Sequence, residues 1–194
     1  MTTANKITIG RILLVPFFIV EMLYYVDSGD EWHRLWAIIS FAVAALLDAA
    51  DGYIARRYHQ QSELGMVLDP LADKLLLLSA IILLSLKNDP YFVRVPLWLT
   101  GTILGRDVII LIGMAVILYV SGKPVVRPRI TGKIATVLQM TVVTWTLFQW
   151  PTRPLTQFTI WAAVFTGVSG LFYIRDGVHQ LNAHPSSAPK SSPH

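Results

Sequence analysis

Long apolar segments dominate this chain of 194 residues and constrain its fold more than any other feature. Hydrophobic residues make up 54% of the sequence, and charged residues only 14%. A soluble domain of this size could not bury that much apolar surface, whereas about 20 apolar residues cross a bilayer as one helix. We therefore predict an all-α integral membrane protein with six transmembrane helices, at residues 7–26, 35–58, 65–86, 95–120, 130–150 and 155–178.

Basic residues predict the orientation, because cytoplasmic loops carry an excess of Lys and Arg. Ten of them fall on the side of the N-terminus: Lys6, Arg11, Arg56, Arg57, Lys123, Arg127, Arg129, Lys133, Arg175 and Lys190. Four fall on the opposite side: Arg34, Lys87, Arg94 and Arg153. We expect both termini in the cytoplasm, with Trp32, Tyr91, Trp98 and Trp150 near the outer membrane interface.

Composition narrows the functional classes. The chain has no cysteine, which excludes disulfides and thiolate metal sites. Its net charge of +4 is explained by cytoplasmic loops, so no nucleic-acid partner is expected. The N-terminal apolar segment lacks a clear small-residue cleavage site, so we expect a retained helix rather than a cleaved signal. We predict a membrane domain over residues 1–182 and a disordered, Ser/Pro-rich tail over residues 183–194.

Four aspartates interrupt this apolar pattern. Asp48 and Asp51 are three residues apart and share one face of the second predicted helix. Asp69 and Asp73 are four apart and share one face near the start of the third. The connection between the two pairs is short and polar and closes with Gly65, so a helical hairpin is expected to bring the four carboxylates together.

Four ionised carboxylates so close together would repel one another strongly at low dielectric, so they need cations. Mg²⁺ takes oxygen ligands and is often bound by carboxylates together with substrate phosphates. Arg56 beside them could contact a phosphate, which indicates metal-dependent phosphoryl transfer. Two alternatives stay open: interhelical ion pairs with Arg56, Arg57 and Lys74, or ligands of a cation pathway.

The stretch from Asp48 to Asp73 fits the pattern D-x2-D-G-x2-A-R-x8-G-x3-D-x3-D at every fixed position. This pattern resembles that of the CDP-alcohol phosphatidyltransferases, integral membrane enzymes that make phospholipids. Six transmembrane helices agree with the fold of that family, and the resemblance covers the chain except its tail.

The resemblance implies a role for each matching residue. Two divalent ions, Mg²⁺ or Mn²⁺, would be held by Asp48, Asp51, Asp69 and Asp73. The CDP moiety would lie against Gly52, Ala55, Arg56 and Gly65. Asp73 would also act as general base, taking the proton of an acceptor hydroxyl that attacks the β-phosphorus of CDP-diacylglycerol and displaces CMP.

The acceptor is indicated by weaker signals. Asn5, Thr8 and Arg11 resemble the opening of phosphatidylglycerophosphate synthases and CMP-forming cardiolipin synthases. Their acceptors, glycerol 3-phosphate and phosphatidylglycerol, both carry a phosphate. We predict glycerol 3-phosphate, although two departures favour the cardiolipin synthase side: Ala135 replaces a second Lys, and Asp107 replaces Glu after Arg106. Candidates for contacting the acceptor phosphate are Arg106, Arg127, Arg129 and Lys133.

Each of these cations also has a simpler explanation. Arg106 could pair with Asp107, and Arg127 and Arg129 could serve only membrane topology. Within the predicted spans, Glu21, Ser40 and Ser79 are expected to hydrogen-bond between helices.

An enzyme is the leading hypothesis, and a cation transporter or a non-catalytic membrane scaffold are the alternatives. A transporter would spread its acids through the depth of the membrane, whereas these cluster near one face. We expect an enzyme of the bacterial inner membrane with its active site facing the cytoplasm. The resemblance also implies a homodimer.

Overall fold

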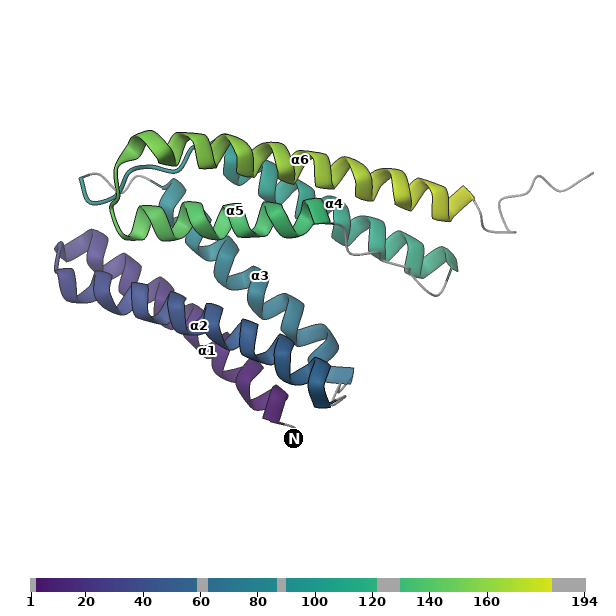
Figure 1. The fold of residues 1–194 in the computed structure, drawn as a ribbon, viewed down its shortest axis with the longest axis horizontal. Helices are drawn as coiled ribbons and strands as arrows, with labels where there is room; N and C mark the ends of the chain where they lie inside the picture. The colour runs from purple at the N-terminus through teal and green to yellow at the C-terminus, as the bar shows by residue number, and fades with distance from the viewer. Residues whose placement is uncertain (1–2, 59–62, 87–89, 122–129, 183–194) are drawn as a thin grey trace, which may run out of the picture. The chain divides into compact units, whose positions relative to one another are not determined.

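The computed structural model describes residues 3–58, 63–86, 90–121 and 130–182, which form helices joined by short turns and irregular segments, with no strand among them (Figure 1). Side chains are not described at residues 3–9, 48–58, 63–73, 114, 117–121 and 179–182. Six helices follow in order: α1 (Thr3–Ser28), α2 (Glu31–Tyr58), α3 (Glu63–Ser85), α4 (Leu97–Ser121), α5 (Ile130–Leu147) and α6 (Thr152–Asn182).

The six helices confirm the six predicted apolar segments. Each helix begins and ends within four residues of its predicted bounds, because Gly, Pro and polar clusters do end the helices where the sequence places them. Among the described residues, Thr152–Val178 is the one span both long and apolar enough to cross a membrane. A shorter apolar stretch, Lys74–Ser85, lies in α3.

The chain divides into two compact units. Unit 1 comprises Met1–Pro96 and Met140–Leu155, and unit 2 comprises Leu97–Gln139 and Thr156–His194. In unit 1, α1 packs against both α2 and α3, and α2 and α3 contact each other. Phe18 of α1 and Phe41 of α2 are buried at this interface, with their ring centroids 5.8 Å apart.

A tight turn joins α1 to α2. Gly29 has a φ of 71°, and its N–H donates to the carbonyl of Tyr25 at 2.8 Å, an arrangement that ends many helices. Asp30 then starts α2, because its carboxylate accepts a hydrogen bond from the N–H of Trp32 at 3.0 Å. Glycine is required at position 29, since an added Cβ would lie 2.5 Å from the hydroxyl of Tyr91.

Aromatic and amide groups connect this turn to other parts of unit 1. The Gln149 side-chain amide donates to the Tyr25 hydroxyl at 2.8 Å and to the Tyr91 carbonyl at 2.9 Å. Gln149 has a φ of 55°, so these two hydrogen bonds hold it in a left-handed conformation that disfavours most side chains. Tyr25, Tyr91 and Gln149 therefore lie together in unit 1, whereas the aromatic belt at a membrane interface stays a prediction.

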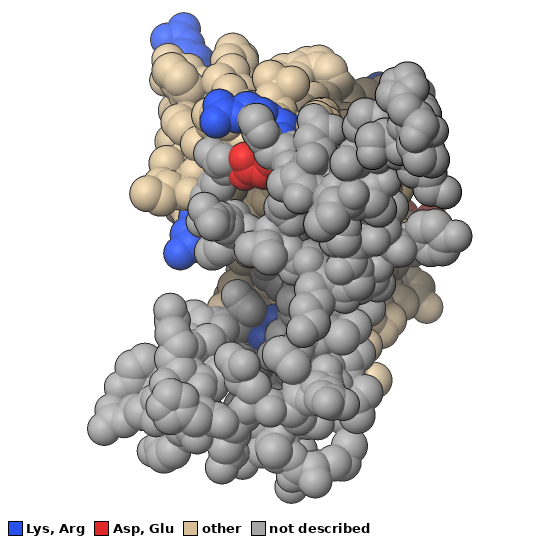
Figure 2. All heavy atoms as spheres, turned by 90° about the vertical axis from the view of Figure 1, so that its right-hand side faces the viewer, with Lys and Arg blue, Asp and Glu red and all other residues tan. Residues whose placement is uncertain are grey.

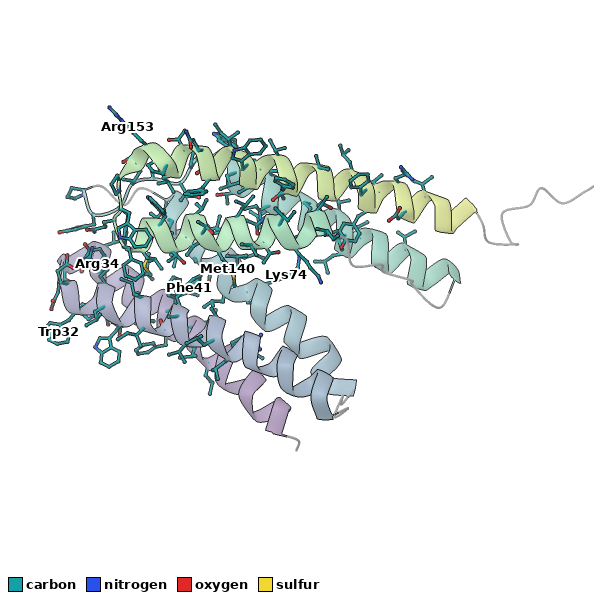
Figure 3. The ribbon with its side chains drawn as sticks, in the orientation of Figure 1. Trp32, Arg34, Phe41, Lys74, Met140 and Arg153 are labelled. Atoms are coloured by element: carbon teal, nitrogen blue, oxygen red, sulfur yellow. The ribbon has the colours of Figure 1, made fainter. Side chains whose placement is uncertain are left out.

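Basic residues predicted on the outer side occupy helix ends in unit 1. Arg34 lies near the start of α2, where its Nη2 is 2.6 Å from the Glu31 carboxylate, and Arg153 projects away from the ribbon near the start of α6 (Figure 3). Arg94 donates from Nε to the carbonyl of Ser85 at 2.9 Å, which satisfies the end of α3. The helix bounds do not orient the chain, so the predicted topology stays a prediction.

Polar side chains within the helices follow two patterns. Glu21 of α1 lies 2.8 Å from Nδ1 of His33 in α2, so this acid does bridge two helices as predicted. Ser40 and Ser79 instead donate to carbonyls three residues earlier in their own helices, Ala37 and Leu76. The interhelical prediction was wrong for both serines, because a hydroxyl on a helix can reach a carbonyl of the preceding turn.

Unit 2 combines an apolar surface with buried polar contacts. Leu111 and Leu171 are about two-thirds exposed, at 65% and 68%, so unit 2 presents large apolar side chains on its surface. Inside the unit, the Gln139 amide donates to the Thr166 hydroxyl at 2.8 Å, and Thr166 donates to the carbonyl of Ala162. The first of these hydrogen bonds joins α5 to α6 at a buried position, where an unpaired amide would be costly.

Replacing Gly29 by alanine should destabilise the protein. The left-handed φ costs an alanine about 1–3 kcal/mol, and its Cβ must also displace the Tyr91 ring. We expect the unfolding temperature of the purified protein in detergent to fall by about 2–4 °C for each kcal/mol lost.

Gly101→Ala is the matched control, because Gly101 lies within α4 and an added Cβ would meet nothing within 4 Å. Alanine favours a helix interior by about 0.5–1 kcal/mol, so this variant should unfold at the same or a higher temperature. Equal unfolding temperatures for Gly29→Ala and the parent would contradict the assignment of the turn.

Candidate functional site

The four predicted metal ligands lie on two consecutive helices. Asp48 and Asp51 belong to the last part of α2, and Asp69 and Asp73 belong to the first part of α3. Figure 1 shows the end of α2 beside the start of α3, and these two helices contact each other. The helix bounds thus confirm that each pair lies on a single helix, at the spacing of one turn.

The side chains of this stretch lie outside the described residues. This applies to the four aspartates and to the residues predicted at the CDP moiety, Gly52, Ala55, Arg56 and Gly65. The ligand set and the role of Asp73 as base therefore stay predictions. Among the side chains that the structure describes, no group of three or more His, Asp or Glu could hold a metal ion.

Packing in unit 1 supports the two helices that carry the aspartates. Ala44 of α2 is fully buried four residues before Asp48, and Leu76 of α3 is buried three residues after Asp73. Arg11 of α1 is 1% exposed, so this helix also places a cation inside the unit. The described parts of α2 and α3 nearest to the pattern are thus fixed by packing, and α1 contacts both.

A second group of charges lies in unit 2, around Arg106. The Arg106 and Asp107 side chains are only 14% and 11% exposed, and Nη1 of Arg106 donates to the Asp107 carboxylate at 2.6 Å. Nη2 of Arg106 lies 3.5 Å from the hydroxyl of Ser169, and its guanidinium carbon lies 5.6 Å from the centroid of the Tyr173 ring. The predicted ion pair between Arg106 and Asp107 is therefore confirmed.

Two glycines make room for this arginine. A Cβ at Gly170 would lie 3.4 Å from Cγ of Arg106, and a Cβ at Gly132 would lie 3.3 Å from its Nη2. The Arg106 side chain thus passes from α4 along α6 to the start of α5. Nε of Arg106 is buried and has no hydrogen-bond partner among the described residues, and the same holds for the hydroxyl of Thr131.

Of the other predicted contacts to the acceptor phosphate, one, Lys133, lies in the described part of the chain. Lys133 is exposed, one residue after Gly132, and Arg127 and Arg129 lie outside the described residues. Ala135, where glycerophosphate-using relatives have a second Lys, is 1% exposed. On the face drawn in Figure 2, basic side chains in blue reach the surface beside an acidic one in red.

Sequence reasoning missed three residues of this cluster: Thr131, Ser169 and Tyr173. Ser169 and Tyr173 are four residues apart, so they occupy one face of α6 and meet Arg106 together. Two polar groups one turn apart in an apolar helix were an available signal. Thr131 lies beside Gly132 at the start of α5, and its burial could not be read from that position.

Known proteins resemble this chain over most of its length. Residues 1–169 match the family model described as CDP-alcohol phosphatidyltransferase. An enzyme of Bacillus subtilis (strain 168) named CDP-diacylglycerol–glycerol-3-phosphate 3-phosphatidyltransferase is 36% identical over 184 residues, which cover 87% of this chain and 91% of the relative.

Enzymes of the same name from two further bacteria are also similar. The Escherichia coli (strain K12) enzyme is 31% identical over 143 residues, or 74% of this chain and 75% of the relative. The Salmonella typhimurium (strain LT2) enzyme is 30% identical over the same shares. A family match over most of the chain, with the complete aspartate pattern on α2 and α3, shows that this chain belongs to the CDP-alcohol phosphatidyltransferase family.

Proposed function

We propose that this enzyme transfers the phosphatidyl group of CDP-diacylglycerol to glycerol 3-phosphate and releases CMP. The observation that carries the proposal is the complete pattern from Asp48 to Asp73 in a chain whose relatives bear the name of that activity. Members of the family are membrane enzymes, which agrees with the exposed leucines of the helices. We further propose six membrane spans, cytoplasmic termini and a bacterial inner-membrane location.

The donor set of α2 and α3 fits hard divalent cations. Asp48, Asp51, Asp69 and Asp73 offer only carboxylate oxygens, which are the ligands that Mg²⁺ and Mn²⁺ favour. Because α2 and α3 contact each other, these oxygens can gather around one site. Two bound ions would supply positive charge to the diphosphate of the donor and to the leaving CMP.

The chain's own residues would position the substrates and move one proton. Arg56 and the small residues Gly52, Ala55 and Gly65 would receive the CDP moiety close to the helix backbone. The Asp73 carboxylate would take the proton of the acceptor hydroxyl, whose oxygen then bonds to the β-phosphorus. The bond from that phosphorus to the CMP oxygen breaks, and CMP leaves with its electron pair.

The residues proposed to contact the acceptor phosphate lie later in the chain than the aspartates. Arg106 is preorganised in unit 2, whereas Lys133 is exposed, and both could contribute a cation to an acceptor phosphate. We propose the same role for Arg127 and Arg129. Phosphatidylglycerol remains a second candidate acceptor, because Ala135 and Asp107 depart from the pattern of glycerophosphate-using relatives. Ala135 is buried and has no positive charge, whereas those relatives have a lysine at this position.

Replacing Asp73 by asparagine should abolish most of the activity. The amide keeps the size of the side chain but cannot accept the hydroxyl proton, so CMP release should fall by a factor of about 10²–10⁴. The measurement is CMP release from CDP-diacylglycerol and glycerol 3-phosphate by purified protein. Asp27→Asn is the control, because Asp27 is exposed at the opposite end of α1 from the N-terminus. Full activity of Asp73→Asn would rule out its proposed role.

Removal of divalent cations should stop the reaction reversibly. Without the ions, four carboxylates repel one another and the diphosphate, so chelation should reduce CMP release to background. Addition of Mg²⁺ or Mn²⁺ should restore it, whereas Ca²⁺ in excess should not, because it favours larger coordination shells. Activity that persists in a chelator would remove the metal from the proposal.

A competition assay should separate the two acceptors. With labelled CDP-diacylglycerol and equal access to both alcohols, we expect phosphatidylglycerophosphate as the main product and little cardiolipin. Cardiolipin as the main product would assign the enzyme to the other acceptor. Cation flux into liposomes without any lipid product would instead support a transporter.

A further inference from the structure

We propose that Asp107, Ser169 and Gly132 are positioning residues that hold one edge of the Arg106 guanidinium toward the acceptor phosphate. The inference rests on the proposed function, since it concerns the acceptor of that reaction. It deepens that function by separating a preorganised cation, Arg106, from the exposed Lys133 and by identifying the groups that orient it.

The ion pair with Asp107 is the first reason. Neighbouring residues on a helix do not face each other, so helix spacing alone does not bring Nη1 of Arg106 to the Asp107 carboxylate, and both side chains must bend toward one another. The 2.6 Å contact occupies Nη1 and fixes the plane of the guanidinium. Asp107 therefore selects which edge of Arg106 is left for another anion.

The remaining donors form the second reason. A guanidinium has five N–H groups and binds a phosphate best through two parallel hydrogen bonds. With Nη1 on Asp107, the edge that can offer two parallel donors is formed by Nε and Nη2. Nε is buried without a hydrogen-bond partner in the described part of the chain, and Nη2 has only a long contact of 3.5 Å with Ser169.

A buried N–H group without an acceptor costs free energy, so the unpartnered Nε of Arg106 in the described part of the chain indicates that a ligand provides the acceptor. The hydroxyl of Thr131 is buried and equally unpartnered among the described residues, one position before Gly132. Gly132 is the residue that lies against Nη2, so the start of α5 approaches the same edge of the guanidinium. A phosphate oxygen accepting from this edge would satisfy donors that the protein leaves unmet.

The close fit around Arg106 is the third reason. Gly170 contacts the stem of the side chain, the Tyr173 ring lies against the guanidinium, and Gly132 lies at its tip. A Cβ at Gly132 would lie 3.3 Å from both Nη2 and the Ser169 hydroxyl, so an added methyl group must push these two atoms by a few tenths of an ångström. Contacts from α5 and α6 thus restrict an arginine that α4 supplies.

The test compares Gly132→Ala and Ser169→Ala with the parent enzyme. Each should raise the KM for glycerol 3-phosphate by about 10-fold, because a misplaced guanidinium loses a charge-assisted contact to the phosphate. The KM for CDP-diacylglycerol and the unfolding temperature without substrate should stay unchanged. Asp107→Asn should act in the same direction, and Asp107→Glu should restore the parent KM because it keeps the charge.

Gly105→Ala is the matched control. Gly105 precedes Arg106 on α4, and an added Cβ there meets no atom within 4 Å, so its kinetic constants should equal those of the parent. Unchanged KM values in Gly132→Ala and Ser169→Ala would overturn the inference. A parallel fall in kcat and in the affinity for both substrates, together with a lower unfolding temperature, would also overturn it by revealing a packing role only.

A second measurement keeps this inference separate from the proposed function. Glycerol 3-phosphate should raise the unfolding temperature of the parent protein, and this increase should be lost in Gly132→Ala and retained in Gly105→Ala. The readout needs no turnover. If the parent releases no CMP with glycerol 3-phosphate but shows this pattern, the proposed activity fails and the positioning role stands. Equal stabilisation of parent and Gly132→Ala overturns the positioning role alone.

Discussion

The cost of placing charges among apolar helices governs this molecule. Every buried ion must find a partner, since neither lipid nor a packed core solvates it. Arg106 meets this requirement in part, through Asp107 at 2.6 Å and the Tyr173 ring, while its Nε stays unpartnered within the described residues. We expect the same requirement, with negative charge, of the four aspartates on α2 and α3.

Helix packing determines where such charges can gather. In unit 1, α1 contacts both helices of the aspartate pattern, and buried side chains such as Ala44 and Leu76 flank that pattern in the sequence. In unit 2, glycines at positions 132 and 170 let α5 and α6 close around one arginine. These small residues let the charged side chain of Arg106 lie close to the backbones of α5 and α6.

The sequence predicted the helices well, because long apolar runs form them and Gly, Pro and polar clusters end them. It also predicted the aspartate pattern, whose spacing needs only local helix geometry to place each pair on one face. The surroundings of Arg106 could not be predicted in this way. Ser169 lies 63 residues from Arg106, so their contact depends on how α4 and α6 pack.

Hydrogen bonds within a single helix explain why two predictions were wrong. Ser40 and Ser79 donate to carbonyls of their own helices, because a serine hydroxyl on a helix can reach a carbonyl of the preceding turn. Glu21 does bridge to His33, since a longer side chain at the end of a tight hairpin can reach the next helix. The length of a side chain and its distance from a turn decide whether it bonds within its own helix or to another helix. The periodicity of the sequence does not give this information.

The most direct test of the central claim is the stoichiometry of the reaction in reconstituted liposomes. Purified protein would receive CDP-diacylglycerol, Mg²⁺ and labelled glycerol 3-phosphate, and CMP and lipid-bound label would be counted together. The account predicts one lipid-bound glycerol phosphate for each CMP released, with neither product in the absence of the acceptor. CMP release without incorporation of the acceptor, or no CMP at all, would contradict it.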